Sequence, residues 1–165
     1  MTILADQLRT HYFGADSPNI DSGSNVAEFI PAVPIDVIEA GIIATTAIVH
    51  NSDNVVVTIS KRPVAGSSSN AVTLKTWTVV PNAATLAAGK GSKVRISAAV
   101  AQATSTMDGS LIDESPTGMF QILPGQSIAL TVTTAAASGA GVGWLRYSEG
   151  GLNAVTELVN YTYKN

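Results

Sequence analysis

The sequence predicts an all-β protein, an antiparallel β-sandwich with an extended N-terminal arm. The chain has 165 residues, which suits one domain with a sizeable core. Its apolar residues recur in short alternating runs of strand length, with turn residues between the runs and almost no room for helices. About nine such runs, many closely spaced, are typical of an antiparallel sandwich or barrel. The long connections between some of them favour a jelly roll over an immunoglobulin-like sandwich.

Residues 1–32 are predicted to form an arm and not part of a sheet. A short helix over Ile3–Tyr12 is expected because apolar residues recur there near a helical spacing. The following segment, Gly14–Asn25, is rich in turn residues, and Pro31 and Pro34 disfavour a central strand. We therefore expect the β-sandwich domain to span residues 33–165.

The strands of the sandwich are predicted from local alternation of apolar and polar residues. In Val55–Ser60 the valines at 55 and 57 share one face with Ile59, and in Lys93–Val100 the charged side chains point outward. Gln126–Thr134 places Ile128, Leu130 and Val132 on one face. The predicted strands are Ile35–Glu39, Ile42–Asn51, Val55–Ser60, Ala71–Val80, Lys93–Val100, Met119–Leu123, Gln126–Thr134, Val142–Ser148 and Val155–Tyr163.

Composition excludes several classes of function. The formal net charge is −3, which leaves no electrostatic footprint for binding nucleic acid. The chain has no cysteine, so disulfides, thiolate nucleophiles and Cys-based metal sites are excluded. No stretch approaches the length and apolar content of a membrane span, and Asp6 interrupts any signal-peptide core. We expect a protein without nucleic-acid or membrane partners.

No residue pattern in the chain names a reaction, so we expect no enzymatic activity, cofactor or metal. His11 and His50 lie in unrelated segments, and neither is spaced for a shared metal site. The loop Asp108–Glu114 holds three carboxylates that calcium could use. A solvated acidic turn has the same composition and is favoured, although the calcium site stays open.

The aromatic residues allow two interpretations. Trp77 and Trp144 could stack on sugar rings, but aromatic residues are only 5% of the chain, so use in the core or an interface is favoured. On this interpretation Trp144 faces the core and Tyr147, on the opposite face of the same strand, lies at the rim. Sixteen serines and 17 threonines supply most of the polarity of the outward strand faces. Sheets so poor in charge suggest that neighbouring subunits cover them, hence a homo-oligomer.

Three segments together resemble a known class of protein. They are PAVPIDVIEAGIIATTAIVHNSDN with VVVTISKRP after it, FQILPGQSIALTV, and a Gly- and Ala-rich loop before GWLRYSE. With the N-terminal arm, this layout resembles the small jelly-roll capsid decoration (cement) proteins of tailed bacteriophages. The resemblance covers roughly Pro31–Tyr163 and includes no diagnostic motif.

The resemblance implies a structural virion protein, made in the host cytoplasm, that binds the outer surface of the capsid and bridges capsomers. Its partners would be the major capsid protein and further copies of itself, and a homotrimer is favoured over a homodimer. Apolar residues of the arm without an obvious core are expected to contact the partner, and deleting residues 1–30 is expected to leave a folded sandwich that binds poorly. These residues are Ile3, Leu4, Leu8, Tyr12, Phe13 and Phe29.

Three alternatives to this function stay open. One is a receptor- or carbohydrate-binding module of a phage tail fibre or baseplate, which predicts that a saccharide changes the fluorescence of Trp77 or Trp144. Another is a hydrolase on a β-sandwich, which predicts an essential pair of acids. The last is another virion part on the same fold, such as a head–tail joint protein.

Overall fold

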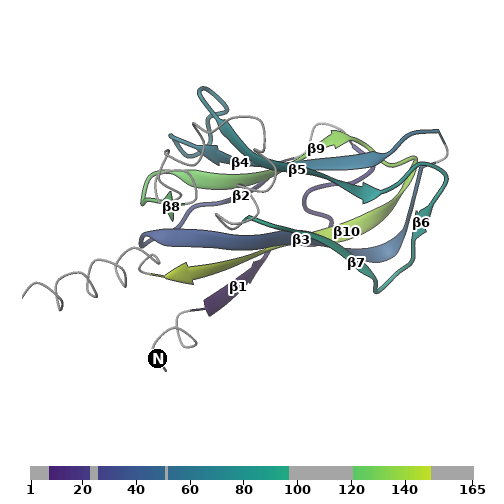
Figure 1. The fold of residues 1–165 in the computed structure, drawn as a ribbon, viewed down its shortest axis with the longest axis horizontal. Helices are drawn as coiled ribbons and strands as arrows, with labels where there is room; N and C mark the ends of the chain where they lie inside the picture. The colour runs from purple at the N-terminus through teal and green to yellow at the C-terminus, as the bar shows by residue number, and fades with distance from the viewer. Residues whose placement is uncertain (1–7, 23–25, 51, 97–120, 150–165) are drawn as a thin grey trace, which may run out of the picture.

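The computed structural model describes residues 8–22, 26–50, 52–96 and 121–149. These residues form two antiparallel β-sheets that stack on each other (Figure 1) and contain no helix. Accordingly, no helix of membrane-spanning length and hydropathy occurs among them. The predicted all-β sandwich is confirmed.

One sheet, sheet A, is built around two long strands, β3 (Ile35–Val49) and β10 (Ser138–Glu149). β1 (Leu8–Tyr12) pairs with the outer edge of β10. Three short strands pair with successive parts of β3 on its other edge: β6 (Thr85–Leu86), β7 (Gly91–Arg95) and β8 (Gln121–Ile122).

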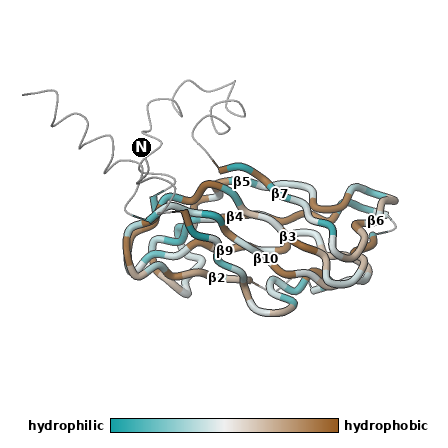
Figure 2. The backbone as a smooth tube through the Cα atoms, turned by 90° about the horizontal axis from the view of Figure 1, so that it is seen from below, coloured by the Kyte–Doolittle hydropathy of each residue, from teal (hydrophilic) through white to brown (hydrophobic). Residues whose placement is uncertain are grey.

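Sheet B has four strands in the order β2, β9, β4, β5. Their bounds are β2 (Val26–Phe29), β9 (Ser127–Thr134), β4 (Val55–Arg62) and β5 (Val72–Val80). Hydrophobic and hydrophilic residues are interspersed along the strands of both sheets (Figure 2), as expected where one face of each sheet is buried.

The strand pairing defines a jelly roll. Four pairs are nested along the chain: β1 with β10, β2 with β9, β3 with β7, and β4 with β5. The chain is thus one long antiparallel hairpin whose turn lies between β4 and β5. Pairing of β10 with β3 and of β9 with β4 then rolls this hairpin into two sheets. In Figure 1 the first strand, β1, accordingly lies beside the last, β10.

The predicted helix over Ile3–Tyr12 is wrong for its described part. Leu8–Tyr12 forms the edge strand β1, with Tyr12 directly opposite Trp144. Two or three turns of helix are marginal in water, whereas a strand here gains a full ladder of backbone hydrogen bonds with β10. Positions 3–7 of the predicted helix lie outside the described residues.

The predicted separation of an arm from the sheets is also wrong where the structure describes it. Val26–Phe29 is strand β2, and the segment before it is held by backbone hydrogen bonds. The amide of Gly143 donates to Ser17 O at 2.8 Å, and that of Ala136 donates to Ile20 O at 2.8 Å. A side chain at position 143 would come within 2.9 Å of Pro18, so the absence of one lets this segment pack against β10.

The core lies between the inner faces of the two sheets. The predicted inward sets of β4 and β9 are confirmed: Val55, Val57 and Ile59 have no exposed surface, and neither do Ile128, Leu130 and Val132. Burying each such side chain contributes roughly 1.5–3 kcal/mol. In β7 the alternation continues as predicted, with Arg95 exposed and Ile96 after it buried. The predicted strand Val155–Tyr163 lies outside the described residues.

A polar cluster connects β2 with β9 and β4 on the outer face of sheet B. The Glu28 carboxylate accepts hydrogen bonds from Ser127 Oγ and, at 2.8 Å, from the amide of Gly66, and Arg62 Nη1 lies 3.5 Å away. Burial alone raises the pKa of Glu28, but these hydrogen bonds and the charge of Arg62 outweigh it. The pKa of Glu28 is therefore below its ordinary value, which means that the cluster holds the carboxylate in its ionised form.

Candidate functional site

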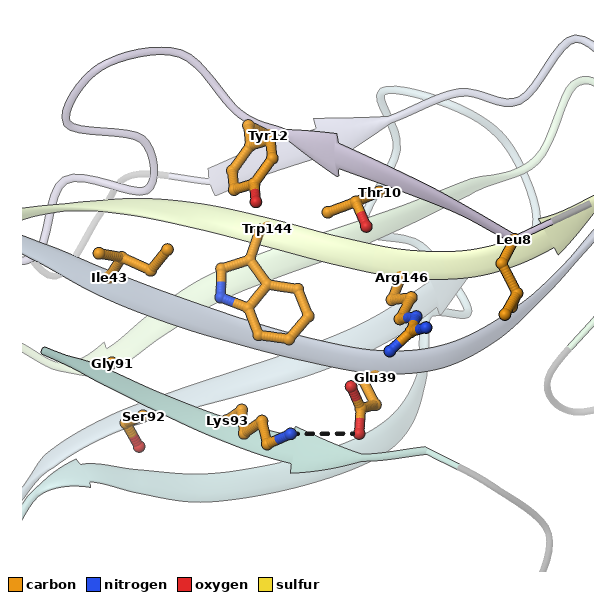
Figure 3. A pocket seen from close by; sticks show the side chains of 10 residues that line it. All are labelled: Leu8, Thr10, Tyr12, Glu39, Ile43, Gly91, Ser92, Lys93, Trp144 and Arg146. Atoms are coloured by element: carbon orange, nitrogen blue, oxygen red, sulfur yellow. Dashed lines mark hydrogen bonds and ion pairs between the residues drawn. The ribbon is translucent and has the colours of Figure 1, made fainter. Parts of the chain in front are cut away.

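A hollow of about 480 Å³ lies on the outer face of sheet A (Figure 3). It is open to solvent on the side away from the core, and its floor is formed by β1, β10, β3 and β7. The residues that line it are Leu8, Thr10, Tyr12, Glu39, Ile43, Gly91, Ser92, Lys93, Trp144 and Arg146.

The indole of Trp144 is the centre of the hollow. The strand register places Trp144 opposite Gly41 of β3, and Gly41 opposite Lys93 of β7. A Cβ atom at position 41 would lie only 2.6 Å from Cε2 of the indole and 2.7 Å from the Ser92 carbonyl oxygen. The ring therefore rests directly on the backbone of β3, in space that only a glycine leaves empty.

Charged side chains gather beside the indole. Arg146 is two residues beyond Trp144 on the same side of β10, opposite Glu39 in the register, and lies between the indole and Leu8 in Figure 3. The Glu39 carboxylate, whose side chain is only 7% exposed, accepts from Lys93 Nζ at 3.5 Å and from Arg95 Nε at 3.3 Å. The Glu39 carboxylate is buried, whereas Lys93 and Arg95 are exposed, so this part of the surface carries an excess of positive charge.

Further charges lie along the strands toward the other end of the face. Asp36 is opposite Ser148 in the register, beyond the row of Arg146. Arg9 and Glu149 form an exposed ion pair there, 3.8 Å apart. The excess of positive charge is thus local to the hollow, in a chain whose formal net charge is −3.

The structure divides the predicted partner-contact residues into three groups. Leu8 and Tyr12 line the hollow and are exposed, Tyr12 by 60% of its surface. Phe13 is buried in the core, and Phe29 is partly buried against it. These two are therefore structural residues, because the arm that was expected to carry them is part of the sandwich. Ile3 and Leu4 lie outside the described residues.

An aromatic cluster explains where Phe13 and Phe29 pack. The ring of His11 meets that of Phe13 edge to face at 5.0 Å and that of Phe29 at 4.4 Å, and Phe29 continues to Tyr147 at 5.3 Å. Burial lowers the pKa of His11 and raises that of Tyr147, so both groups are held neutral. The cluster joins β1, β2 and β10 across the gap between the sheets.

Sequence reasoning assigned the two faces of β10 the wrong way round. Trp144 was expected in the core and Tyr147 at the rim, whereas Tyr147 packs against the core and Trp144 lies on the outer face. The inner position belongs to Leu145, which has no exposed surface. Tyr147 follows two positions later and shares the inner side with Leu145 by simple alternation, while the register shift beside it leaves Ile38 of β3 without a partner in β10. The signal that could have located Trp144 is Gly41, because a glycine inside a strand often marks a close approach.

The outer face of sheet B has a different character. We call the threonines and valines of its central part the threonine face. The register aligns Thr131, Thr58 and Thr76 in one row across three strands, and the hydroxyls of Thr58 and Thr76 are 2.9 Å apart. No charged side chain lies in that row. The members are Val26, Val56, Thr58, Thr76, Thr78, Thr131 and Thr133.

The histidines and acids of the described ranges make no metal site. No group of three or more potential ligands is found there. His50 instead accepts hydrogen bonds at Nδ1 from the amides of Ser52 and Asp53, at 3.2 and 2.8 Å, and so shapes a turn. The acidic loop Asp108–Glu114 lies outside the described residues, so its two interpretations both stand.

No model of a protein family matches this chain, and no curated protein matches it. Among solved structures, it is similar to a chain of cocksfoot mottle virus, with 10% identity over 90% of this chain and 96% of that one, at a TM-score of 0.32. It is also similar to a mutant VP2 protein of infectious bursal disease virus, with 12% identity over 90% of this chain and 34% of that one, at a TM-score of 0.28.

A chain from a structure of deformed wing virus shows 7% identity over 91% of this chain and 45% of that one, at a TM-score of 0.29. The chain thus spans about a third of the VP2 protein and less than half of the deformed wing virus chain. The jelly-roll assignment follows from the strand pairing.

Proposed function

We propose that this protein is a structural component of a virion that binds the outer surface of a viral shell and stabilises it by bridging neighbouring shell subunits. This protein would be made in the host cytoplasm. Its partner on the shell would be the major capsid protein. Jelly rolls are a common architecture of viral capsid domains, which supports the class by analogy of fold.

The observation that carries this proposal is the threonine face. Its side chains offer methyl groups for packing and hydroxyls for hydrogen bonds, with no ion to desolvate. A protein that braces a shell needs many modest contacts over a wide surface, and this face supplies them on the regular surface of one sheet. Self-association as a homotrimer would use the same kind of surface at the free edge of sheet B, which β5 forms.

Co-sedimentation with shells assembled from the major capsid protein of the same virus tests the proposal. We expect saturable binding and a higher melting temperature of the shells in the presence of the protein. The double variant Thr76→Lys/Thr78→Lys places two charges on the threonine face and should weaken binding about tenfold or more, because both charges would be desolvated in the contact.

The matched control is Thr45→Lys/Thr46→Lys, which adds the same charges to two exposed threonines of β3 in sheet A. This control should bind shells as the natural protein does. The proposed function would be contradicted if both double variants lost shell binding equally. It would also be contradicted if the natural protein neither bound the shells nor raised their melting temperature.

A further inference from the structure

The hollow around Trp144 has the composition of a ligand site and does not belong to the threonine face. We infer that it binds an acidic saccharide, that is, a sugar that carries a carboxylate. The inference is independent of the proposed virion role, since the two surfaces lie on opposite sides of the sandwich (Figure 1). Three features of the hollow lead to this class of ligand.

The first feature is the platform. The indole of Trp144 has one face against the backbone at Gly41 and is only partly buried, so its other face is turned to the hollow. A flat aromatic surface is complementary to the C–H face of a pyranose ring. Because Gly41 fixes the position of the indole, little conformational entropy is lost when a sugar stacks on it.

The second feature is the set of hydroxyls around the indole. Thr10 and Tyr12 of β1 lie on one side of it, and Ser92 of β7 lies on the other (Figure 3). A saccharide presents hydroxyls around its ring edge, and each needs a partner that can both donate and accept. An apolar platform with a few polar groups around it is the usual composition of a small-molecule site.

The third feature is positive charge beside the platform. Glu39 pairs with Lys93 and Arg95, and none of the ion pairs between described residues includes Arg146. The guanidinium of arginine is a planar fork of donors that fits a carboxylate in two parallel hydrogen bonds. Arg146 lies beside the indole, so it is placed for a carboxylate on a stacked sugar ring (Figure 3).

The test is a calorimetric and fluorescence titration of the full chain with a trimer of galacturonic acid and with the matching trimer of galactose. The two probes differ only in the carboxylates. We expect the acidic trimer to bind about tenfold more tightly, because a hydrogen-bonded ion pair adds to the stacking. It should also change the tryptophan emission in a Trp77→Phe background, where Trp144 is the remaining tryptophan.

Variants separate the two parts of the site. Trp144→Ala should abolish binding of both trimers, and Arg146→Gln should remove the preference for the acidic one while the protein stays folded. Lys75→Gln, which removes a cation from sheet B, is the matched control and should leave both affinities unchanged. Equal affinity for the two trimers, no binding of either in the millimolar range, or an unchanged preference in Arg146→Gln would overturn the inference.

Discussion

At the scale of single residues, Gly41 decides where the aromatic surface of this protein lies. Because nothing projects from β3 at that point, the indole of Trp144 can rest on the sheet and form the floor of the hollow. The site is therefore built by a residue that has no side chain of its own.

Gly41→Ala is expected to lower the free energy of unfolding by about 1–3 kcal/mol, because the new Cβ atom would displace both the indole and the Ser92 carbonyl. Urea unfolding measures the change. Gly14→Ala is the control, since a Cβ atom at position 14 meets nothing within 4 Å, and it should change stability by less than about 0.5 kcal/mol. Equal stability of the two variants would show that the indole does not need the space above Gly41.

The charge of Glu28 is expected to contribute to stability. Glu28→Ala should cost about 1–3 kcal/mol, because Arg62, which is 9% exposed, loses its carboxylate partner. Glu149→Ala breaks the exposed pair with Arg9 and should cost less than about 1 kcal/mol. Comparable losses in the two variants would contradict the special role of the buried cluster.

The lowered pKa of Glu28 also predicts how stability depends on pH. The unfolded chain takes up the proton near the ordinary value of 4.5, before the folded chain does. The stabilisation is therefore fully present above that pH and is lost as the pH falls through the lowered folded value. Urea unfolding between neutral pH and the acid range should show this decline in the natural protein, and Glu28→Gln should flatten it.

Residue patterns predicted part of this detail. The inward residues of β4 and β9 follow from simple alternation, and they are buried as expected. Trp144 could not be assigned to a face in this way, because the register of β10 on β3 depends on pairing between distant segments. Local alternation reports which residues share a face of a strand but not which face is turned to the core.

At the scale of elements, local reasoning missed β1, β2 and the two-residue strand β6. β1 is five residues long and β2 four, and each follows or precedes turn-rich sequence. Both are strands because β10 and β9 offer them free edges, and each of their residues has its partner 99 or more residues further along the chain. Long central strands, by contrast, carry enough alternation to be recognised without their partners.

Removal of residues 1–30 should therefore unfold the protein and not merely impair binding. The truncation takes away both strands together with Phe13 and Ile20, which are buried in the core. Circular dichroism and thermal unfolding should show no cooperative transition. The control is removal of residues 1–7, after which the cooperative transition should persist. A truncated protein without residues 1–30 that still melts cooperatively would restore the view of this segment as a separate arm.

At the scale of the whole molecule, the two outer faces of the sandwich are chemically unlike. Sheet A presents a positive, aromatic hollow, and sheet B presents uncharged threonines. Composition predicted the hydroxyl-rich face but not the hollow, because residues from four strands, at positions as far apart as 8 and 146, are brought together there. The all-β class was predictable from strand spacing, and the jelly roll is confirmed by the nested pairs.

Light scattering with size exclusion is expected to show a homotrimer in solution, because the threonine face, which extends to the edge strand β5, carries no charge to keep copies apart. Thr76→Lys/Thr78→Lys should shift the mass toward that of a monomer, about 17 kDa by composition. A natural protein that stays monomeric at high concentration would show that these surfaces tolerate water and assemble only on another protein.

The nested pairing also decides when the fold can be completed during synthesis. Tyr12 and its partner Trp144 are separated by 132 positions in the chain. At roughly 5 to 20 residues per second, a ribosome needs roughly 7 to 26 s to make that stretch. β4 and β5 can pair early, whereas β1 emerges first and joins its sheet last. During this interval the polar residues Arg9, Thr10 and His11 within β1 oppose its pairing with other nascent chains.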